Sequence, residues 1–318
     1  MDDARTPPPT TLGWIDLWLL TVVVTWAVNF RAAQLAGRLA DGARLDPRTL
    51  IVLRMALVVP VLVPLAAKLG RRSIGEIFAM SRRDFVILAG LAFAAIPCNQ
   101  FLFVWGMQHT SSIHGALLFA TSPALASLLA QSAGIERTGK RVWWGMAIAF
   151  LGVALVVSRS TVAPGATRSD ADPGLLGDAL ILASATSWAI YAAASAPVLG
   201  RRSAIELTAL TMSFGLVWTV ILFGNAVWRD LAGGGLSRLT PSGIGGILYI
   251  AYLGALYGWV VWTVGIARIG STRTMLYQYL VPLLSMVLGV AFFGEHVEAR
   301  AVAGAGMILA GVALGRRG

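Results

Sequence analysis

The side chains of this sequence that could bind a small solute are polar and aromatic residues spaced three or four apart within apolar segments. One such stripe lies on a single helix face and consists of Ser184, Trp188, Tyr191 and Ser195. A second stripe has nearly the same spacing and consists of Trp18, Val22, Trp26 and Asn29. A polar group gains nothing by facing lipid, so the stripes predict the lining of an internal cavity. Helix packing or interfacial aromatic contacts are the alternative interpretation.

Two aromatic candidates lie in another apolar segment. Tyr252 and Trp259 share an arc of about 80° with Tyr249 at 100° per residue, on the side of the helix opposite Gly254 and Gly258. Close packing on the glycine face would leave the aromatic rings for a cavity or, alternatively, for the lipid interface.

Three prolines inside apolar segments predict hinges or plain kinks, and they are Pro97, Pro123 and Pro282. Proline lacks an N–H group and so frees the carbonyl four residues earlier, as at Gln278 before Pro282. Asn99 follows Pro97, while Gln278 and Ser285 share a face with Pro282. We therefore add Asn99, Gln278 and Ser285 to the candidate cavity residues.

Ionisable groups inside the apolar segments are few. Arg54 could snorkel outward, bind a carboxylate group of a substrate or pair within the bundle. Asp16 and Asp178 lie in the first turns of their segments and are the candidates for proton coupling. Since no Asp or Glu lies near the middle of any segment, we expect facilitated diffusion or weak proton coupling for any solute that crosses.

The sequence contains no recognisable catalytic or metal-binding constellation. Cys98 is the single cysteine, which excludes an intrachain disulfide and a cysteine-based metal site. The histidines are His109, His114 and His296, of which the first two do not share a helix face and have no carboxylate nearby in sequence. We predict no catalytic residue, no metal and no cofactor.

The elements that position these residues are long apolar helices. The chain has 318 residues, of which 57% are hydrophobic and 13% charged, and its mean hydropathy is +0.75. About 20 apolar residues make one helical crossing of a bilayer, so the composition predicts an all-α polytopic membrane protein of about ten crossings. The expected segments are 12–34, 49–67, 85–106, 113–133, 142–158, 175–197, 204–226, 242–266, 275–293 and 301–315. Residues 1–11 are polar and proline-rich and predict a disordered tail.

Basic residues between these segments predict the orientation of the chain. The net charge is +10. With the N-terminus inside, the inner segments carry fifteen Lys and Arg residues and the outer segments carry eight. This excess predicts both termini in the cytoplasm, at the cell inner (plasma) membrane. The same argument assigns the positive charge to membrane topology and predicts no nucleic-acid partner.

An internal repeat relates the two halves of the sequence. A shift of 159 residues superposes Pro123 on Pro282 and Glu136 on Glu295. The same shift also finds matches for Gly106, Ser112, Gly145 and the run 152–155. A shift of 162 residues superposes Asp16 on Asp178 and Trp26 on Trp188. Five helices in each half would make the second copy enter the membrane from the opposite side. We predict repeats at 12–158 and 174–315 joined by a linker at 159–173.

These residues resemble a known family. Thr25-Trp26-Ala27-Val28-Asn29, Pro123 with Gly134-Ile135-Glu136, and Pro282 with Gly294-Glu295 look like the two EamA repeats of the drug/metabolite transporter superfamily. The resemblance covers about residues 12–315. It implies a ten-helix carrier of small metabolites, often an exporter of amino acids, that works by alternating access around a midplane site. It also places Glu136 and Glu295 at the family's turn and Arg54 at the arginine of its second helix.

The aromatic content narrows the expected solute. Eleven Trp and six Tyr, without a run of cations inside the segments, fit a neutral or zwitterionic, partly apolar solute such as an amino acid, including the aromatic ones. An integral-membrane enzyme and a non-transporting receptor or channel subunit are the alternatives. The expected partners are the small-molecule substrate and the lipid bilayer. The sequence leaves the oligomeric state open, because its glycine-rich fifth and tenth segments could pack within the bundle or against another protomer.

Overall fold

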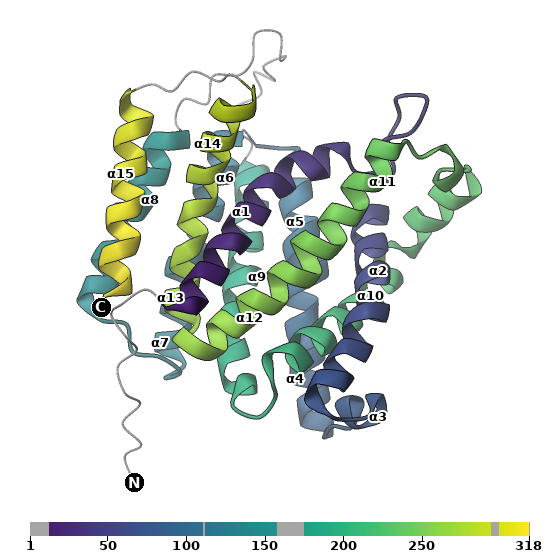
Figure 1. Cartoon of the computed structure of the whole chain (residues 1–318), viewed down its shortest axis with the longest axis horizontal. Coiled ribbons are helices and arrows are strands. Elements are labelled where there is room, and N and C mark those ends of the chain that lie inside the picture. Colours follow the sequence, from purple (N-terminus) through teal and green to yellow (C-terminus); the bar gives the residue numbers. More distant parts are fainter. Residues whose placement is uncertain (1–12, 111, 158–174, 294–298, 318) are drawn as a thin grey trace.

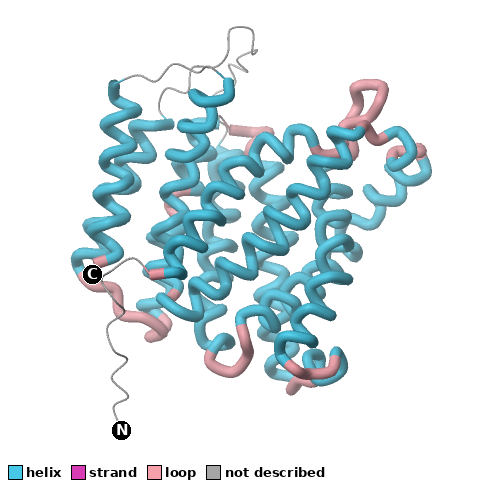
Figure 2. Tube along the Cα trace, viewed as in Figure 1, coloured by secondary structure: helices cyan, strands magenta, loops and turns pink. Residues whose placement is uncertain are grey.

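The computed structural model describes residues 13–110, 112–157, 175–293 and 299–317. Long helices run between two ends of a bundle, and turns gather at those ends (Figures 1 and 2). Over the described ranges, extended pairing is confined to two isolated bridges, Arg38 with Arg44 and Leu39 with Leu239. The predicted tail and linker fall almost entirely on residues 1–12 and 158–174, which lie outside the described ranges.

The helices of the first half are α1 (Trp14–Leu35), α2 (Pro47–Gly70), α3 (Ile74–Phe78), α4 (Arg82–Phe93), the π-helical η1 (Ala94–Cys98), α5 (Asn99–Gly106), α6 (Ser112–Phe119), α7 (Ser122–Ser132) and α8 (Lys140–Val157). Those of the second half are α9 (Leu175–Leu199), α10 (Ala204–Ala232), the 3₁₀ turn η2 (Leu236–Arg238), α11 (Pro241–Leu248), the π-helical η3 (Tyr249–Tyr257), α12 (Gly258–Ile269), α13 (Ser271–Leu276), the 3₁₀ turn η4 (Tyr277–Tyr279), α14 (Leu280–Phe293) and α15 (Ala299–Arg316).

Eight helices of the described residues are long and apolar enough to cross a membrane. They are Trp14–Leu35, Pro47–Gly70, Arg82–Gly106, Gly115–Ser132, Leu175–Leu199, Ala204–Ala232, Pro241–Ile269 and Ala299–Arg316. The expected segments 142–158 and 275–293 correspond to α8 and to the interrupted rod α13–η4–α14, which are helical but not among the eight. The chain is a multi-pass membrane protein, and the count of ten crossings stays a prediction.

Helical winding is interrupted at or just before each of the three prolines, and the hinge role stays a prediction. Pro123 lies in the first turn of α7, and Pro282 is the third residue of α14. A proline in a first turn costs no hydrogen bond, because the N–H group there has no partner within the helix. Pro97 lies inside η1, where the Asn99 N–H donates to the carbonyl of Ala94, five residues back, so winding changes at this proline.

Glycines form the closest helix pair of the bundle, between α8 and α15 (Figure 1). A Cβ atom at Gly145 would lie 2.5 Å from the Gly315 nitrogen, and one at Gly311 would lie 2.5 Å from the Gly145 oxygen. A Cβ at Gly152 would lie 2.7 Å from the Gly304 oxygen. We call this contact the glycine seam. The two helices that the repeat makes equivalent therefore pack against each other within one chain.

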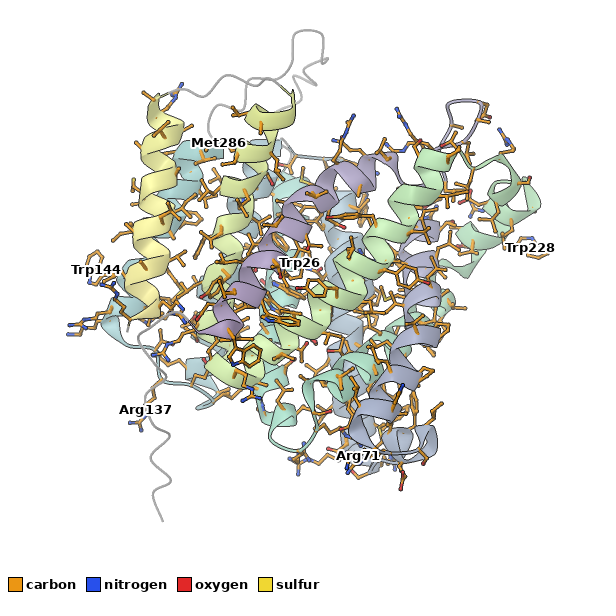
Figure 3. All side chains as sticks on the ribbon, viewed as in Figure 1. Trp26, Arg71, Arg137, Trp144, Trp228 and Met286 are labelled. Atoms are coloured by element: carbon orange, nitrogen blue, oxygen red, sulfur yellow. The ribbon has the colours of Figure 1, made fainter. Side chains whose placement is uncertain are left out.

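The other extensive pairs also obey the repeat. The contact of α2 with α10 again joins equivalent helices, and those of α5 and α7 with α9 are matched by contacts of α12 and α14 with α1. The first turn of α1 lies at the same end as the last turn of α15, since Arg316 forms an ion pair with Asp16. Figure 3 places Arg71 and Arg137 toward this same end.

Candidate functional site

Five aromatic side chains meet where α1, α9 and α12 come together, and we call them the aromatic cluster: Trp26, Trp188, Tyr191, Trp259 and Trp262. The Trp26 ring centroid is 4.8 Å from that of Trp262 and 6.1 Å from that of Trp188. Trp188 stacks on Tyr191 at 5.5 Å and meets Trp259 edge-on at 5.2 Å. Figure 3 shows Trp26 near the centre of the bundle. Since Trp26 and Trp188 are repeat equivalents, their contact joins the two halves.

Hydrogen bonds fix the orientation of three of these rings. The Trp188 Nε1–H donates to Oε1 of Gln278 at 3.0 Å, and the Trp26 Nε1–H donates to the carbonyl of Gly254 at 3.0 Å. The Tyr191 hydroxyl lies 3.3 Å from Oγ1 of Thr263. A buried indole or phenol normally has such a partner, so the cluster is a defined arrangement of rings.

Asn99 and Ser184 form a separate closed pair. The Asn99 amide donates to the carbonyl and hydroxyl of Ser184 at 3.0 and 3.1 Å, and the Ser184 hydroxyl donates to the Asn99 carbonyl at 2.7 Å. Ser195 likewise donates to the carbonyl of Tyr191 at 2.6 Å. These polar groups satisfy one another, so they connect α5 to α9 and one turn of α9 to the next.

The predicted separation of aromatic and glycine faces at residues 249–259 is wrong. The Tyr249 hydroxyl donates to the Thr25 carbonyl of α1. The glycines face the same helix: a Cβ at Gly254 would lie 2.5 Å from Asn29 Oδ1, and a Cβ at Gly258 would lie 2.6 Å from Trp26 Nε1. The reason is the π-helical winding of η3, because the arc of the sequence argument assumed 100° per residue.

Several buried polar atoms have no hydrogen-bond partner within the described part of the chain. They include Asn29 Oδ1, Arg54 Nε, Trp262 Nε1 and Ser285 Oγ. Asn29 lies beside Gly254, which accepts the Trp26 hydrogen bond, and Trp262 is in the aromatic cluster. Burying such a group without a partner costs about 1–3 kcal/mol, so each needs an explanation such as a ligand or ordered water.

Two of the predicted cavity residues lie away from the cluster. Trp18 is 49% exposed and contacts Trp14 and Tyr257 at ring distances of 6.4 and 6.3 Å. Tyr252 is half-buried and packs against the main hydrophobic core, without a ring contact among those of the cluster. Trp18 therefore faces the outside of the bundle, although Val22, one turn further along the same stripe, is fully buried.

Asp16 and Asp178 are already engaged. Asp16 is fully buried, forms an ion pair with Arg316, and accepts hydrogen bonds from the Tyr277 hydroxyl and the Gly13 N–H. Asp178 accepts a hydrogen bond from the Thr110 hydroxyl. Asp16 thus fastens the start of α1 to the end of α15 and to η4.

Glu136 caps a helix of the other half. Its carboxylate accepts hydrogen bonds from the Ser271 N–H at 2.6 Å, the Ser271 hydroxyl at 2.8 Å and the Thr272 N–H at 3.0 Å. An acidic group at the first turn of α13 satisfies N–H groups that lack partners within the helix. Glu295, its repeat equivalent, lies outside the described residues.

A cavity of about 250 Å³ opens between the start of α2 and α5. It is lined by Asp46, Arg48, Ile51 and Trp105, among others. Arg48 donates to Asp46 at 2.9 and 2.6 Å, and these bonds hold the pKa of the Asp46 carboxyl below its ordinary value of 3.8. Arg54 does not line this cavity.

No group of three or more metal-ligating side chains occurs among the described residues. His109 contacts the Trp105 carbonyl through Nδ1 at 2.9 Å, and His296 lies outside the described ranges.

Sequence reasoning missed Trp262, Tyr277 and Arg316. Trp262 follows Trp259 by three residues and could have been placed on the same helix face. The contacts of Tyr277 and Arg316 with Asp16 join residues 261 or more positions apart, and nothing in local spacing indicates them.

The comparisons with known proteins agree with this architecture. The model of the EamA-like transporter family matches residues 13–158 and again 175–315. The Bacillus subtilis protein named "Uncharacterized transporter YyaM" is 30% identical over 217 residues, which cover 66% of either chain. A "Probable terminal-alkyne amino-acid exporter" of Streptantibioticus cattleyicolor is 27% identical over 306 residues, 94% of this chain and 92% of that one. A solved crystal structure with 16% identity superposes with a TM-score of 0.72 over 96% of this chain and 98% of the other, a likeness of fold. Two matched copies of one family model, spread over nearly all the chain, show that it belongs to the EamA-like transporter family.

Proposed function

We propose that this protein moves a small neutral or zwitterionic metabolite, in first place an amino acid, across the inner (plasma) membrane by alternating access. Export or facilitated diffusion is the mode that we favour. The observation that carries the proposal is a pair of unpartnered polar atoms at the aromatic cluster: Trp262 Nε1 within it, and Asn29 Oδ1 beside Gly254, which accepts the Trp26 hydrogen bond. The relative named as an amino-acid exporter supports the same solute class.

The unpartnered atoms match the two ends of an amino acid. Arg54 Nε and Trp262 Nε1 are donors, suited to a carboxylate, and Asn29 Oδ1 is an acceptor, suited to an ammonium group. The side chain of the solute would contact the rings of Trp26 and Trp188, which pack against other rings of the cluster in this structure, once the cluster opens. A phosphate ester would instead need several Lys and Arg residues at the site.

Coupling to protons is weak or absent in this proposal. A proton carrier must lose and regain its proton as the protein changes state, and Asp16 is held by a cation and two hydrogen-bond donors. Both termini face the cytoplasm, as the excess of basic residues on one side suggests. The protein is a carrier that performs no covalent chemistry on its solute.

The test is uptake of a mixed pool of amino acids and small metabolites into proteoliposomes, read by mass spectrometry. We expect selective accumulation by the wild type that Trp188→Ala and Arg54→Gln each reduce by tenfold or more, as expected when about 1.4 kcal/mol or more of binding free energy is lost. Trp228→Ala is the matched control, because Trp228 is 72% exposed and belongs to no part of the cluster. Collapse of a pH gradient should leave accumulation of the favoured solute unchanged.

Two results would count against the proposal. Folded wild-type protein that accumulates no member of the pool would favour the receptor, channel or enzyme alternatives. Equal accumulation by Trp188→Ala, Arg54→Gln and the wild type would place the solute path elsewhere.

A further inference from the structure

A second cavity, of about 420 Å³, lies at the junction of α3, the start of α4 and the turn from α9 to α10. Charged side chains dominate its lining: Arg72, Arg201, Arg202, Glu76 and Asp84. Arg71, next to this lining, is labelled at the end of the bundle in Figure 3. The cavity therefore opens at the level where loops leave the membrane, away from the aromatic cluster.

The carboxylates of this cavity are engaged by groups of the protein. Glu76 accepts hydrogen bonds from the Ser73 N–H at 2.6 Å and the Ser73 hydroxyl at 2.9 Å. These bonds hold the pKa of Glu76 below its ordinary value, so it stays ionised as the cap of α3. Asp84 pairs with Arg201 at 2.9 Å.

The arginines retain donors for a ligand. Arg202 donates to the carbonyls of Ile77 and Ala79 at 2.8 and 3.1 Å, which fixes its guanidinium beside the end of α3. Arg72 reaches Glu206 only at 3.5 Å and is half exposed. Each guanidinium has five N–H donors, and the contacts above use one or two of them.

Charge and apolar exposure occur together around the cavity. The helix ends and turns that carry its lining also hold Lys68, Arg71, Arg82 and Arg83. With the three lining arginines these make seven cations, compared with three carboxylates, those of Glu76, Asp84 and Glu206. Next to lining residues in the sequence, Phe78, Phe85 and Val86 are 38%, 50% and 62% exposed. A free anion needs the cations alone, whereas a lipid needs both features.

We propose that this cavity binds the phosphate headgroup of an anionic phospholipid, with the guanidiniums of Arg72 and Arg201 on the phosphate and the acyl chains along the exposed side chains of α4. A guanidinium can donate two parallel N–H hydrogen bonds to two oxygens of one phosphate. The bound lipid would hold α3 and the turn between α9 and α10 against α4 at the membrane surface.

The experiment is native mass spectrometry of the full chain in neutral detergent, titrated with dioleoyl phosphatidylglycerol or dioleoyl phosphatidylcholine, which share their acyl chains. We expect preferential binding of phosphatidylglycerol that weakens about fivefold for each cation removed in Arg72→Gln and Arg201→Gln, and on the order of 25-fold in the double variant. Arg238→Gln is the matched control, since Arg238 is a similarly exposed arginine paired with Asp41 that does not line this cavity.

Asp84→Asn is a second test that does not remove an arginine, and so it serves if the arginine variants fail to fold. It removes a competing carboxylate and leaves all three arginines, so phosphatidylglycerol should bind more tightly than to the wild type. Equal binding of the two lipids by the wild type, or an unchanged preference in the double variant, would overturn the proposal. Abolition of the phosphatidylglycerol preference by millimolar inorganic phosphate, with retention of phosphate adducts by the lipid-free protein, would also overturn it in favour of a free-phosphate site.

Discussion

The glycine seam between α8 and α15 gives a sharp prediction about stability, because α15 contains both a buried and an open glycine. A Cβ at Gly311 would lie 2.5 Å from the Ala149 nitrogen and 2.5 Å from the Gly145 oxygen. A Cβ at Gly306 would meet nothing within 4 Å. Alanine at both positions changes the same helix by the same methyl group, so the difference between the variants isolates the seam.

The expected magnitudes follow from these distances. Ordinary Cβ contacts begin near 3.4 Å, so Gly311→Ala must separate the helices by about 1 Å. Overpacking of this kind costs about 1–3 kcal/mol, against which alanine gains about 1 kcal/mol of helix propensity over glycine. The net loss is then up to about 2 kcal/mol, so we expect Gly311→Ala to lower the melting temperature by up to about 4–8 °C and Gly306→Ala, which keeps only the gain in propensity, to raise it by up to about 2–4 °C.

The assay is thermal unfolding of the purified variants in one detergent at one protein concentration, followed by the monodisperse fraction after heating. Gly145→Ala should repeat the effect of Gly311→Ala, and the double variant should lose less than the sum, because a seam already opened accepts the second methyl group more easily. A melting temperature for Gly311→Ala equal to or above that of Gly306→Ala would refute the reasoning. Transport at low temperature should survive in both variants, since neither residue belongs to the aromatic cluster.

Three further predictions concern charged groups at the ends of the bundle. Asp16→Asn and Arg316→Gln should each destabilise the protein. A double-mutant cycle of the two, measured by thermal unfolding, should show a coupling free energy of about 1–3 kcal/mol. Additive losses in the double variant would mean that the two charges do not stabilise each other. Glu136→Gln should cost about 1–2 kcal/mol in the same assay, because it weakens the cap of α13, and an unchanged melting temperature would contradict that role. Asp46 has a lowered pKa in the folded protein, so its stabilising contribution is full above its unfolded value of 3.8 and is lost as the pH falls below it. Melting temperatures measured between pH 3 and 6 should therefore fall less steeply for Arg48→Gln than for the wild type, and parallel curves would exclude this source of acid sensitivity.

The sequence predicts the helices and the repeat well because both depend on local composition and on residue spacing. The contact of Trp26 with Trp188 agrees with the repeat, because these residues occupy equivalent places in two copies of one fold. The prediction for residues 249–259 was wrong for a local reason: the π-helical winding of η3 changes the angle per residue, and no residue type in the segment demands that winding.

Long-range partners were beyond reach of the spacing argument. The engagement of Asp16 depends on Arg316, almost the full length of the chain away, and the cap of α13 depends on Glu136 in the other half. Trp18 follows the same spacing as Trp26 but is 49% exposed, because it lies nearer the start of α1, where its ring meets Trp14 and Tyr257 and not the cluster. These differences arise from packing, which residue types in one segment do not encode.

The two π-helical stretches have a consequence for motion. A π turn holds one surplus residue, and that surplus can pass to the next turn by exchanging i→i−5 for i→i−4 hydrogen bonds, which rotates the intervening residues by about 100°. In η1 the five-residue stretch contains Pro97, which has no N–H group to exchange, so the surplus is pinned there. In η3 the nine-residue stretch has no proline, and Gly254 within it and Gly258 directly after it lie against α1. The two copies of one architecture therefore differ at this point: proline obstructs the exchange of hydrogen bonds in the first half, and no proline does so in η3.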